Sequence, residues 1–312
     1  MTTLNNNVKK KFSNANVKRI LFITAVLALP LTIFAVFYIG VNLNSILLSF
    51  KKYVPATGEY VWGAGLANFK QFFDEMATQA FMSYAWKNTF IMFGVNLLIN
   101  LPFHVFNAYY VSKKNIGSKI FRFLLFLPSI LSSVITVTMF RYFIMYGLPE
   151  LWKLFDWGNL PDLVYGIDTG FTTIMVYSFW VNFGGSIILF LGVMNRIPPS
   201  LLEAGALDGV TPIKEFVYII LPLIFPTISI FILNLIASFF AQQGALYTFY
   251  GSGARKEFYT FGYYYYIEVL GTAGEANYPM ASAAGLLFTI VIVPIVLAFR
   301  KVMNTICPPV DY

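Results

Sequence analysis

Charged residues are scarce in this chain. Of its 312 residues, 11% are charged and 58% are hydrophobic, whereas an average soluble chain has about 25% charged and roughly 45–50% apolar residues. A soluble fold of this length needs a charged surface, and the chain has too few charges to cover one. Lipid is therefore the expected solvent for much of the molecule.

Cysteine and histidine are scarcer still. The single cysteine, Cys307, excludes an internal disulfide and a cysteine-rich metal site. The single histidine, His104, lies in an apolar stretch, where a pore-lining or helix-facing role is favoured over a catalytic one. A membrane-embedded enzyme would need clustered carboxylates, a metal-binding set or a nucleophile beside a base. We therefore predict no catalytic and no metal-binding residue.

Long uncharged stretches dominate what is present. Six stretches without Asp, Glu, Lys or Arg reach the length of about 18 residues at which a membrane span becomes the expected structure. They predict an all-α fold, a polytopic membrane helical bundle of about six transmembrane helices. A tail over residues 1–19 precedes a membrane domain over residues 20–312, with spans at about 20–50, 88–112, 121–145, 169–194, 222–242 and 277–299.

The first uncharged stretch resembles a signal peptide because five basic residues precede it. However, the apolar core of a signal peptide has about 7–15 residues, and this stretch has 31. We therefore expect a retained first helix, kinked at Pro30.

Basic residues are distributed unevenly between the predicted loops. With the N-terminus inside, the cytoplasmic segments carry 13 Lys and Arg against 4 Asp and Glu, and the outer segments carry 8 against 10. An excess of Lys and Arg in cytoplasmic loops is the usual pattern, so both termini are predicted to be cytoplasmic. The net charge of +7 is explained in this way and does not indicate a nucleic-acid partner.

The predicted loop over residues 196–222 has an unusual pattern of turn residues. Pro198 and Pro199 are tolerated at the start of a helix, Asp208-Gly209 signals a turn, and Thr211-Pro212 is typical of a second helix start. Two short helices joined by a turn follow from this pattern. Without further information, an amphipathic connector on the membrane surface would explain it as well.

A family resemblance favours a more specific interpretation. The segment resembles the cytoplasmic EAA loop of permease subunits in binding-protein-dependent ABC importers, of the carbohydrate-uptake, maltose-permease-like type. That loop has the pattern Glu-Ala-Ala, Asp-Gly-Ala and Ile-x-Leu-Pro, and this chain has Glu203-Ala204-Gly205, Asp208-Gly209-Val210 and Ile219-Ile220-Leu221-Pro222. Gly205 and Val210 replace two alanines of the pattern. The segment over residues 65–69, Gly-Leu-Ala-Asn-Phe, is also similar to a segment of sugar permeases.

The resemblance implies a set of partners. The EAA loop, as a coupling helix, would dock on a cytoplasmic ABC ATPase dimer, which would bind ATP and Mg²⁺, because this chain lacks the Gly-x-x-x-x-Gly-Lys-Ser/Thr phosphate-binding pattern. A second permease subunit, expected to be non-identical, and an extracytoplasmic solute-binding protein would complete the importer in a bacterial inner membrane. The residues expected to couple to the ATPase are Glu203, Ala204, Gly205, Asp208, Gly209, Leu221 and Pro222.

The solute is expected to be a sugar or oligosaccharide. Aromatic residues, 33 Phe, 20 Tyr and 5 Trp, can stack on sugar rings, although most aromatic residues of a membrane protein fill helix interfaces. The candidate path residues are Trp180, Asn182, Asn234, Phe239, Gln242 and Gln243. Polar side chains within a span are costly unless they face the bundle interior, which favours Asn182 and Asn234 among them. The tyrosines at 263–266 either line an outer vestibule or form an interfacial aromatic cluster.

Three other functions remain open at the sequence level. The first is an importer permease for another solute, such as a peptide. The second is a membrane-embedded enzyme, which the scarcity of catalytic side chains disfavours. The third is a signalling partner that couples an ATPase to a sensor without transport.

Overall fold

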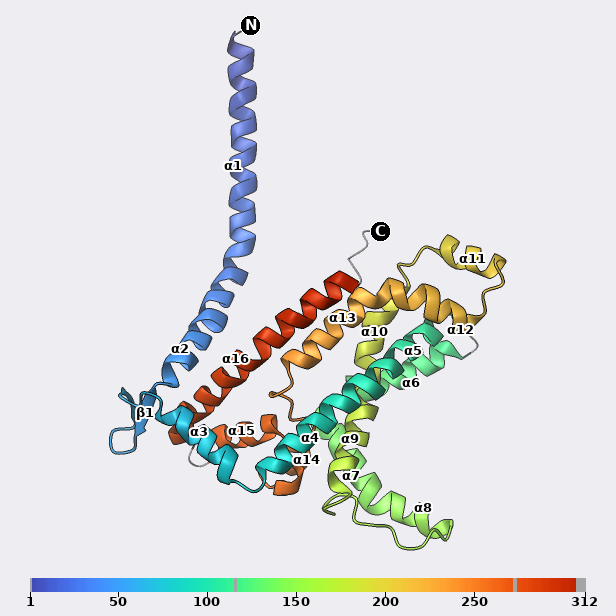
Figure 1. Cartoon of the computed structure of the whole chain (residues 1–312). Helices are drawn as coiled ribbons and strands as arrows, with labels where there is room; N and C mark the ends of the chain where they lie inside the picture. The colour runs from blue at the N-terminus through green and yellow to red at the C-terminus, as the bar shows by residue number, and fades with distance from the viewer. Residues whose placement is uncertain (1, 115–116, 272–273, 307–312) are drawn as a thin grey trace. The chain divides into compact units, whose positions relative to one another are not determined.

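The computed structural model describes residues 2–114, 117–271 and 274–306, and Cys307 lies outside these ranges. The chain divides into two compact units, one of residues 1–73 and 275–286 and the other of residues 74–274 and 287–312. Figure 1 gives the order of the elements along the chain. The helices α3 (Ala67–Thr78) and α16 (Gly274–Ile306) each belong partly to both units.

The first unit begins with a long apolar helix. It comprises α1 (Thr2–Ile33), the π-helical segment η1 (Phe34–Gly40) and α2 (Val41–Leu48). The helix continues through Pro30, and the change to π-helical hydrogen bonding begins four residues later. Its large apolar side chains from Val17 to Leu47 are exposed, as expected for a surface that faces lipid.

A short antiparallel hairpin follows, formed by β1 (Lys51–Val54) and β2 (Glu59–Trp62), with Lys51 opposite Trp62. Asn68, the asparagine of the sugar-permease-like segment, donates hydrogen bonds from its amide to the carbonyl oxygens of Ser49 and Lys51, both at 2.8 Å. Asn68 therefore fixes the start of the hairpin against the start of α3.

The second unit contains the other helices. These are α4 (Met82–Val95), η2 (Asn96–Asn100), α5 (Leu101–Ser112), α6 (Ser118–Ile130), α7 (Ser133–Tyr142), η3 (Phe143–Gly147), α8 (Leu148–Leu154), α9 (Gly170–Val181), α10 (Phe183–Met194), α11 (Pro199–Leu207), α12 (Pro212–Glu215), η4 (Phe216–Ile220), α13 (Leu221–Ala237), α14 (Leu246–Tyr250), η5 (Lys256–Phe258) and α15 (Phe261–Leu270). Two buried clusters hold them together. One, around Ile187, Phe190 and Ile224, joins α5, α6, α10 and α13. The other is mostly aromatic and joins α4, α9, α14 and α15.

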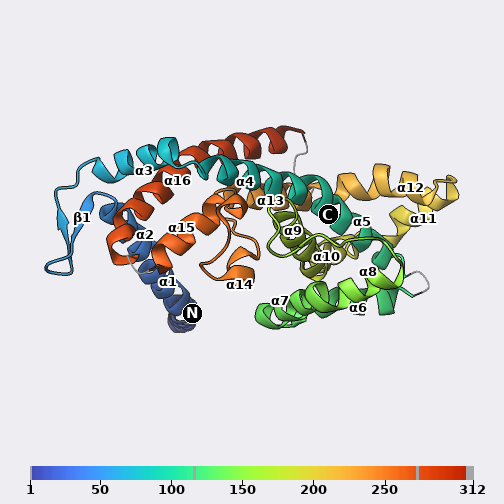
Figure 2. The same ribbon diagram turned by 90° about the horizontal axis from the view of Figure 1, so that it is seen from below.

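The helices α5, α6 and α10 lie side by side (Figure 2). Gly184 permits the close approach of α10 to α6, because a β-carbon at this position would lie 2.7 Å from the carbonyl oxygen of Leu125 and 2.9 Å from the Cα of Phe126. Neither backbone atom can move without shifting the helix.

Within the described residues, five helical segments are long and apolar enough to cross a membrane: Val17–Leu48, Met82–Ser112, Gly170–Met194, Pro212–Ala237 and Ala276–Ile306. A sixth is reached if the pair Ser118–Ile130 and Ser133–Leu154 counts as one broken span. The predicted all-α membrane bundle is thus confirmed. The chain is a multi-pass membrane protein.

The third predicted span, 121–145, is not one straight helix. The two helices of the pair meet at an angle of 103°, and Leu131 and Ser132 between them have extended backbone conformations, with ψ of 152° and 139°. Pro128 lies just before this break. A proline within a helix removes one backbone hydrogen bond and crowds the preceding turn, which favours a break at this place.

The tyrosines at 263–266 lie mostly in the aromatic cluster. Tyr263 is fully buried, and its hydroxyl donates to the carbonyl oxygen of Gly251 at 2.8 Å while the N–H of Ala254 donates to it. Burial raises the pKa of Tyr263 to about 12, so the hydroxyl keeps its proton at physiological pH. Tyr264 donates to Glu75 at 2.9 Å. These two side chains stabilise the fold rather than present a free surface.

Candidate functional site

The loop over residues 196–222 contains the two short helices that its sequence predicts, and it is called the coupling loop after the role expected from the family resemblance. Helix α11 (Pro199–Leu207) starts at the proline pair, and α12 (Pro212–Glu215) starts after Thr211. Gly209 between them has a φ of +73°, a conformation that glycine adopts without strain. Thr211 occupies the N-cap position in an extended conformation but makes no capping hydrogen bond with its side chain.

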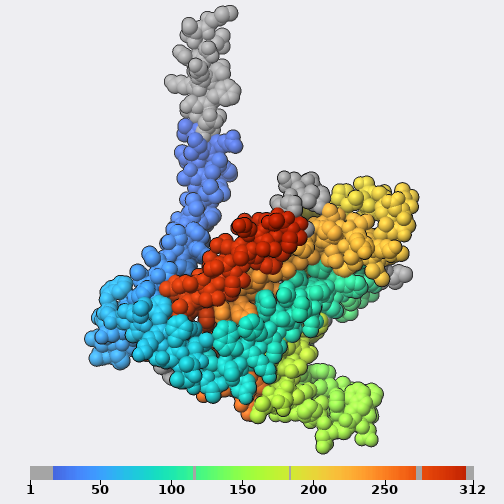
Figure 3. Space-filling model, viewed as in Figure 1, coloured from blue at the N-terminus to red at the C-terminus, as the bar shows by residue number. Residues whose placement is uncertain are grey.

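The two sides of α11 differ in exposure. Glu203, Ala204 and Asp208 are exposed, and Leu207 and Ile213 expose 89% and 78% of their surface. In Figure 3 the coupling loop, in yellow and orange, is open on the face drawn. Glu203 and Leu207 lie four residues apart in α11 and therefore on the same side of it, so a carboxylate and an exposed apolar side chain share this surface.

Gly205 is the buried residue of α11 and faces the next helix. A β-carbon at this position would lie 2.9 Å from the Cδ1 of Ile219, and the carbonyl oxygen of Gly205 accepts the N–H of Val210 at 3.0 Å. Glycine thus lets η4 pack against α11.

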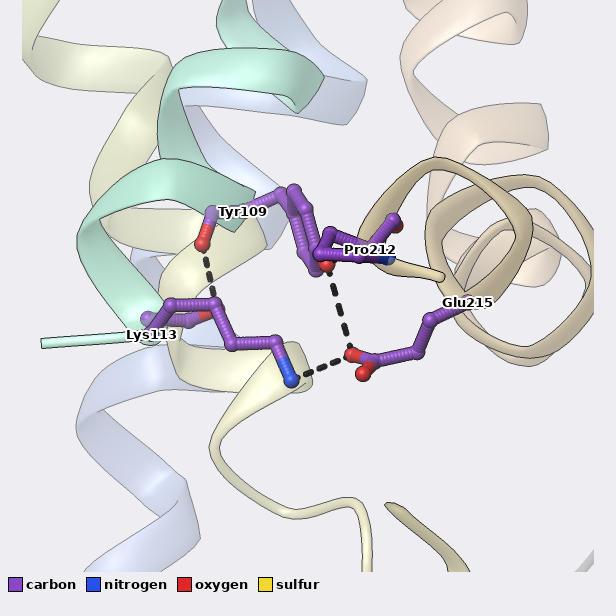
Figure 4. A network of polar contacts seen from close by, with 5 residues as sticks. Tyr109, Lys113, Pro212 and Glu215 are labelled. Atoms are coloured by element: carbon purple, nitrogen blue, oxygen red, sulfur yellow. Dashed lines mark hydrogen bonds and ion pairs between the residues drawn. The ribbon is translucent and has the colours of Figure 1, made fainter. Parts of the chain in front are cut away.

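A polar network joins the coupling loop to the end of α5 (Figure 4). Tyr109 donates from its hydroxyl to the carbonyl oxygen of Pro212 at 3.0 Å and to Glu215 at 3.4 Å. Lys113 forms an ion pair with the same carboxylate, and its ammonium lies 5.6 Å from the centre of the Tyr109 ring. The side chains of Lys113 and Glu215 are 30% and 13% exposed. Movement of the coupling loop is therefore tied to the second span.

A cavity of about 450 Å³ lies among the helices of the second unit. Met92, Leu101, Tyr177 and Phe231 supply part of an apolar wall, and amides, hydroxyls and one imidazole supply the polar groups. The polar residues that line it are Asn96, Asn100, His104, Ser133, Ser178, Asn182, Ser186, Gln242 and Thr248. None of the lining residues carries a carboxylate, an ammonium or a guanidinium.

The amides on one side of this cavity form a chain. Asn100 donates from its amide to Asn96 Oδ1 at 2.8 Å, Asn96 donates to Gln242 Oε1 at 3.4 Å, and Gln242 donates to the hydroxyl of Ser238 at 2.9 Å. Each amide is oriented by its neighbour, so the donors and acceptors that remain have fixed directions.

Three buried polar atoms of the cavity lining lack a hydrogen-bond partner among the described residues. They are Asn100 Oδ1, His104 Nε2 and Ser178 Oγ. A buried polar group without a partner costs about 1–3 kcal/mol, a cost that water or solute hydroxyls in the cavity would offset. The arrangement suits a neutral, hydroxyl-rich solute.

Comparison with known proteins agrees with the family resemblance of the loop over residues 196–222. No family model matches the sequence. The chain is 29% identical over 246 residues to the sn-glycerol-3-phosphate transport system permease protein UgpA of Yersinia pestis, covering 76% of this chain and 79% of that one. It is 34% identical over 189 residues, 59% of each chain, to the probable ABC transporter permease protein YesP of Bacillus subtilis.

Two further similarities extend this comparison. The arabinooligosaccharides transport system permease protein AraP of Halalkalibacterium halodurans is 25% identical over 205 residues, 64% of this chain and 62% of that one. A solved chain of a bacterial ABC transporter that imports the acidic polysaccharide alginate superposes with a TM-score of 0.75 at 21% identity, over 93% of this chain and 98% of the other. The chain is a permease of the ABC-importer type. The resemblance seen in its coupling loop is thereby confirmed.

The structure places the candidate path residues of this permease in different environments. Asn182 and Gln242 line the cavity. The others lie elsewhere: Trp180 stacks on Phe140, Phe239 packs edge-on against Phe90 and Phe93, Asn234 is exposed, and Gln243 is half-buried outside the lining. Of the coupling residues, Leu221 is half-buried and Pro222 is exposed at the start of α13.

Several residues of the permease site were not singled out from the sequence. Asn96 and Asn100 interrupt the second uncharged stretch four residues apart, so the criterion that selected Asn182 would have selected them as well. Lys113 and Glu215 are charges at the edges of two uncharged stretches. Nothing in their local sequence shows that they meet.

Proposed function

We propose that this permease forms half of a translocation pathway for a sugar or an oligosaccharide. The observation that carries the proposal is the uncharged polar cavity, in which oriented amides and unpaired buried acceptors meet an apolar wall. Sugars combine hydroxyls with apolar ring faces, and this lining offers a partner for both. AraP is named for arabinooligosaccharide transport, UgpA for glycerol phosphate, and the solved neighbour imports an acidic polysaccharide.

A peptide permease is the alternative solute class. A free peptide brings an ammonium and a carboxylate into the pathway, and a cavity without charged side chains leaves both without an ionic partner. The names of the relatives also favour sugars over peptides.

The coupling loop supports a proposal for the partners. Leu207 and Ile213, with Glu203 beside them, would dock on a separate cytoplasmic ATPase dimer that binds ATP and Mg²⁺. The neighbour solved with a periplasmic protein that holds an alginate pentasaccharide supports an external solute-binding protein. A second permease subunit, expected to be non-identical, would complete the pathway. In this arrangement the coupling loop and both termini are cytoplasmic.

Solute uptake tests the proposal. Cells with the complete importer should accumulate at least one sugar from a panel of labelled oligosaccharides, and cells that lack this chain should not. Glu203→Lys should leave the permease in the membrane yet lower uptake by at least tenfold, while ATP hydrolysis by the complex continues. Lys214→Gln, an exposed change in the same loop, is the control and should retain uptake. If loss of the chain left the uptake of every sugar unchanged, the proposed function would be refuted. Normal uptake by Glu203→Lys would refute the coupling role.

A further inference from the structure

A second cavity, of about 350 Å³, opens beside α7 and η3 in the second unit. It differs from the first because a guanidinium, that of Arg141, lines it. Thr138, Tyr142 and Tyr146 supply its other polar groups together with Thr248, which lines both cavities. Thr248 is therefore a point of contact between the charged cavity and the uncharged one.

The backbone and the loops hold Arg141 in a fixed orientation. Its guanidinium donates to the carbonyl oxygen of Phe249 at 2.8 Å and to the hydroxyl of Tyr165 at 2.9 Å. These bonds use two of the five N–H groups of an arginine. The remaining donors are available to a ligand that enters the cavity.

The charge of Arg141 has no close counter-ion among the described residues. The ion pairs found there join Lys113 to Glu215, Lys153 to Glu150 and Arg255 to Glu257. Asp162 lies in the same region, but its carboxylate accepts the backbone N–H groups of Val164 and Tyr165 at 3.0 and 2.9 Å. Within the described residues Arg141 thus forms no ion pair, although the carboxylate of Asp162 lies in the same region.

Two tyrosine rings line the same cavity as this guanidinium. Tyr142 and Tyr146 stack with their centres 5.6 Å apart and their planes inclined by 29°, and they expose 62% and 61% of their surface. Exposed aromatic faces in the same cavity as a guanidinium that forms no ion pair within the described residues fit a ligand that has both a ring with apolar faces and a carboxylate. A guanidinium binds carboxylates through paired, charge-assisted hydrogen bonds.

We propose that the Arg141 cavity is a subsite for the carboxylate of an acidic sugar, such as a uronate, at the entrance to the uncharged cavity. This inference rests on the proposed function and names the class of sugar that the permease prefers. The carboxylate pairs with Arg141, the sugar ring lies against Tyr142 or Tyr146, and the neutral hydroxyls reach the amides beyond Thr248.

The uptake of two matched solutes, measured separately, tests this subsite. The complete importer, with its ATPase and binding protein, is reconstituted in vesicles and supplied with a neutral oligosaccharide or with its uronate counterpart of the same length. We expect Arg141→Gln to lower the ratio of uronate to neutral uptake by about tenfold, the effect of one charge-assisted contact. Arg141→Lys, which keeps the charge but loses the paired geometry, should retain part of the preference.

Two further variants separate charge from folding. Lys153→Gln removes another positive charge from the same part of the chain, where the side chain is 73% exposed, and should leave the ratio unchanged. Met145→Glu adds a carboxylate to an exposed residue of the cavity lining and should lower uronate uptake selectively, even if Arg141→Gln fails to fold.

The outcomes separate this inference from the proposed function. Transport of neutral sugars alone by the natural permease, or an equal loss of both solutes in Met145→Glu and Arg141→Gln, would overturn the acidic subsite and leave the sugar permease intact. Absence of transport for every sugar would overturn the proposed function itself.

Discussion

At the residue scale, the contact between Lys113 and Glu215 determines how firmly the coupling loop is held. Glu215 accepts from Tyr109 and pairs with Lys113, and its side chain is only 13% exposed. An exposed ion pair contributes about 0.2–1 kcal/mol. A half-buried pair with a further hydrogen bond contributes more, because loss of one partner leaves the other charge with little water around it.

Charge reversal measures this contact. Lys113→Glu places two carboxylates together and should lower the apparent Tm of the purified complex by about 2–4 °C, which corresponds to roughly 1 kcal/mol. Combining it with Glu215→Lys should restore part of the loss, because the ion pair returns while the bond from Tyr109 does not. Lys153→Glu is the control, since Lys153 and Glu150 are both 73% exposed, and it should shift Tm by less than about 1 °C. Equal shifts of Tm in Lys113→Glu and Lys153→Glu would show that the contact between Lys113 and Glu215 does not stabilise the protein.

Only some of the candidate path residues line the cavity of about 450 Å³. Asn182 and Gln242 line the cavity, as expected of amides in uncharged stretches. Asn234 is exposed outside the lining, and Trp180 and Phe239 pack against other aromatic rings. The sequence shows that a ring is present but does not show whether its neighbours are rings from other helices.

At the scale of elements, π-helical segments accompany Leu-Pro pairs. The segments η2, η3 and η4 each end directly before such a pair, at Leu101-Pro102, Leu148-Pro149 and Leu221-Pro222. Proline lacks an N–H and crowds the carbonyl four residues earlier, and the wider turn relieves both problems. In η2 the wider turn also carries Asn96 and Asn100 to the cavity, consistent with the frequent occurrence of such turns at functional sites.

The Leu-Pro pair Leu127-Pro128 has a different outcome, since the helix breaks after it at Leu131 and Ser132. The local sequence does not separate the two outcomes. At Leu127-Pro128, α10 packs closely against the turn before the proline, since Gly184 lies against the backbone of Leu125 and Phe126, a contact that the local sequence cannot show. The lengths of the uncharged stretches predicted the spanning helices, whereas the bends depend on contacts between helices that these lengths do not show.

Two adjacent glycines of α10 test this packing. Gly184→Ala introduces a β-carbon within 3 Å of the α6 backbone, whereas a β-carbon at Gly185 meets nothing within 4 Å. Both changes raise helix propensity by the same amount, up to about 1 kcal/mol. We expect Gly184→Ala to lower the apparent Tm by several degrees, since overpacking costs about 1–3 kcal/mol, and Gly185→Ala to leave it equal or higher. Similar Tm values for both variants would mean that α10 does not approach α6 this closely.

At the scale of the whole molecule, the broken pair α6–α7 decides the topology. The loop charges, +9 on one side and −2 on the other, assume that the pair crosses the membrane. If it instead re-enters and returns, the segment around Asn159 stays inside and the coupling loop lies outside, where no ATPase could bind it. The proposed function therefore depends on a crossing made by a helix pair with a 103° bend.

Cysteine labelling in intact cells resolves this point. In a Cys307→Ser background the chain has no other cysteine, so single cysteines at Ala56 in the hairpin turn, Asn159 after α8 and Ala206 in α11, all exposed positions, report one segment each. A membrane-impermeant maleimide should label Ala56→Cys and Asn159→Cys from outside, and Ala206→Cys only after permeabilisation. Labelling of Ala56→Cys and Ala206→Cys from outside, with Asn159→Cys protected, would show a re-entrant pair. That result would contradict the predicted cytoplasmic position of the coupling loop and with it the proposed coupling to an ATPase.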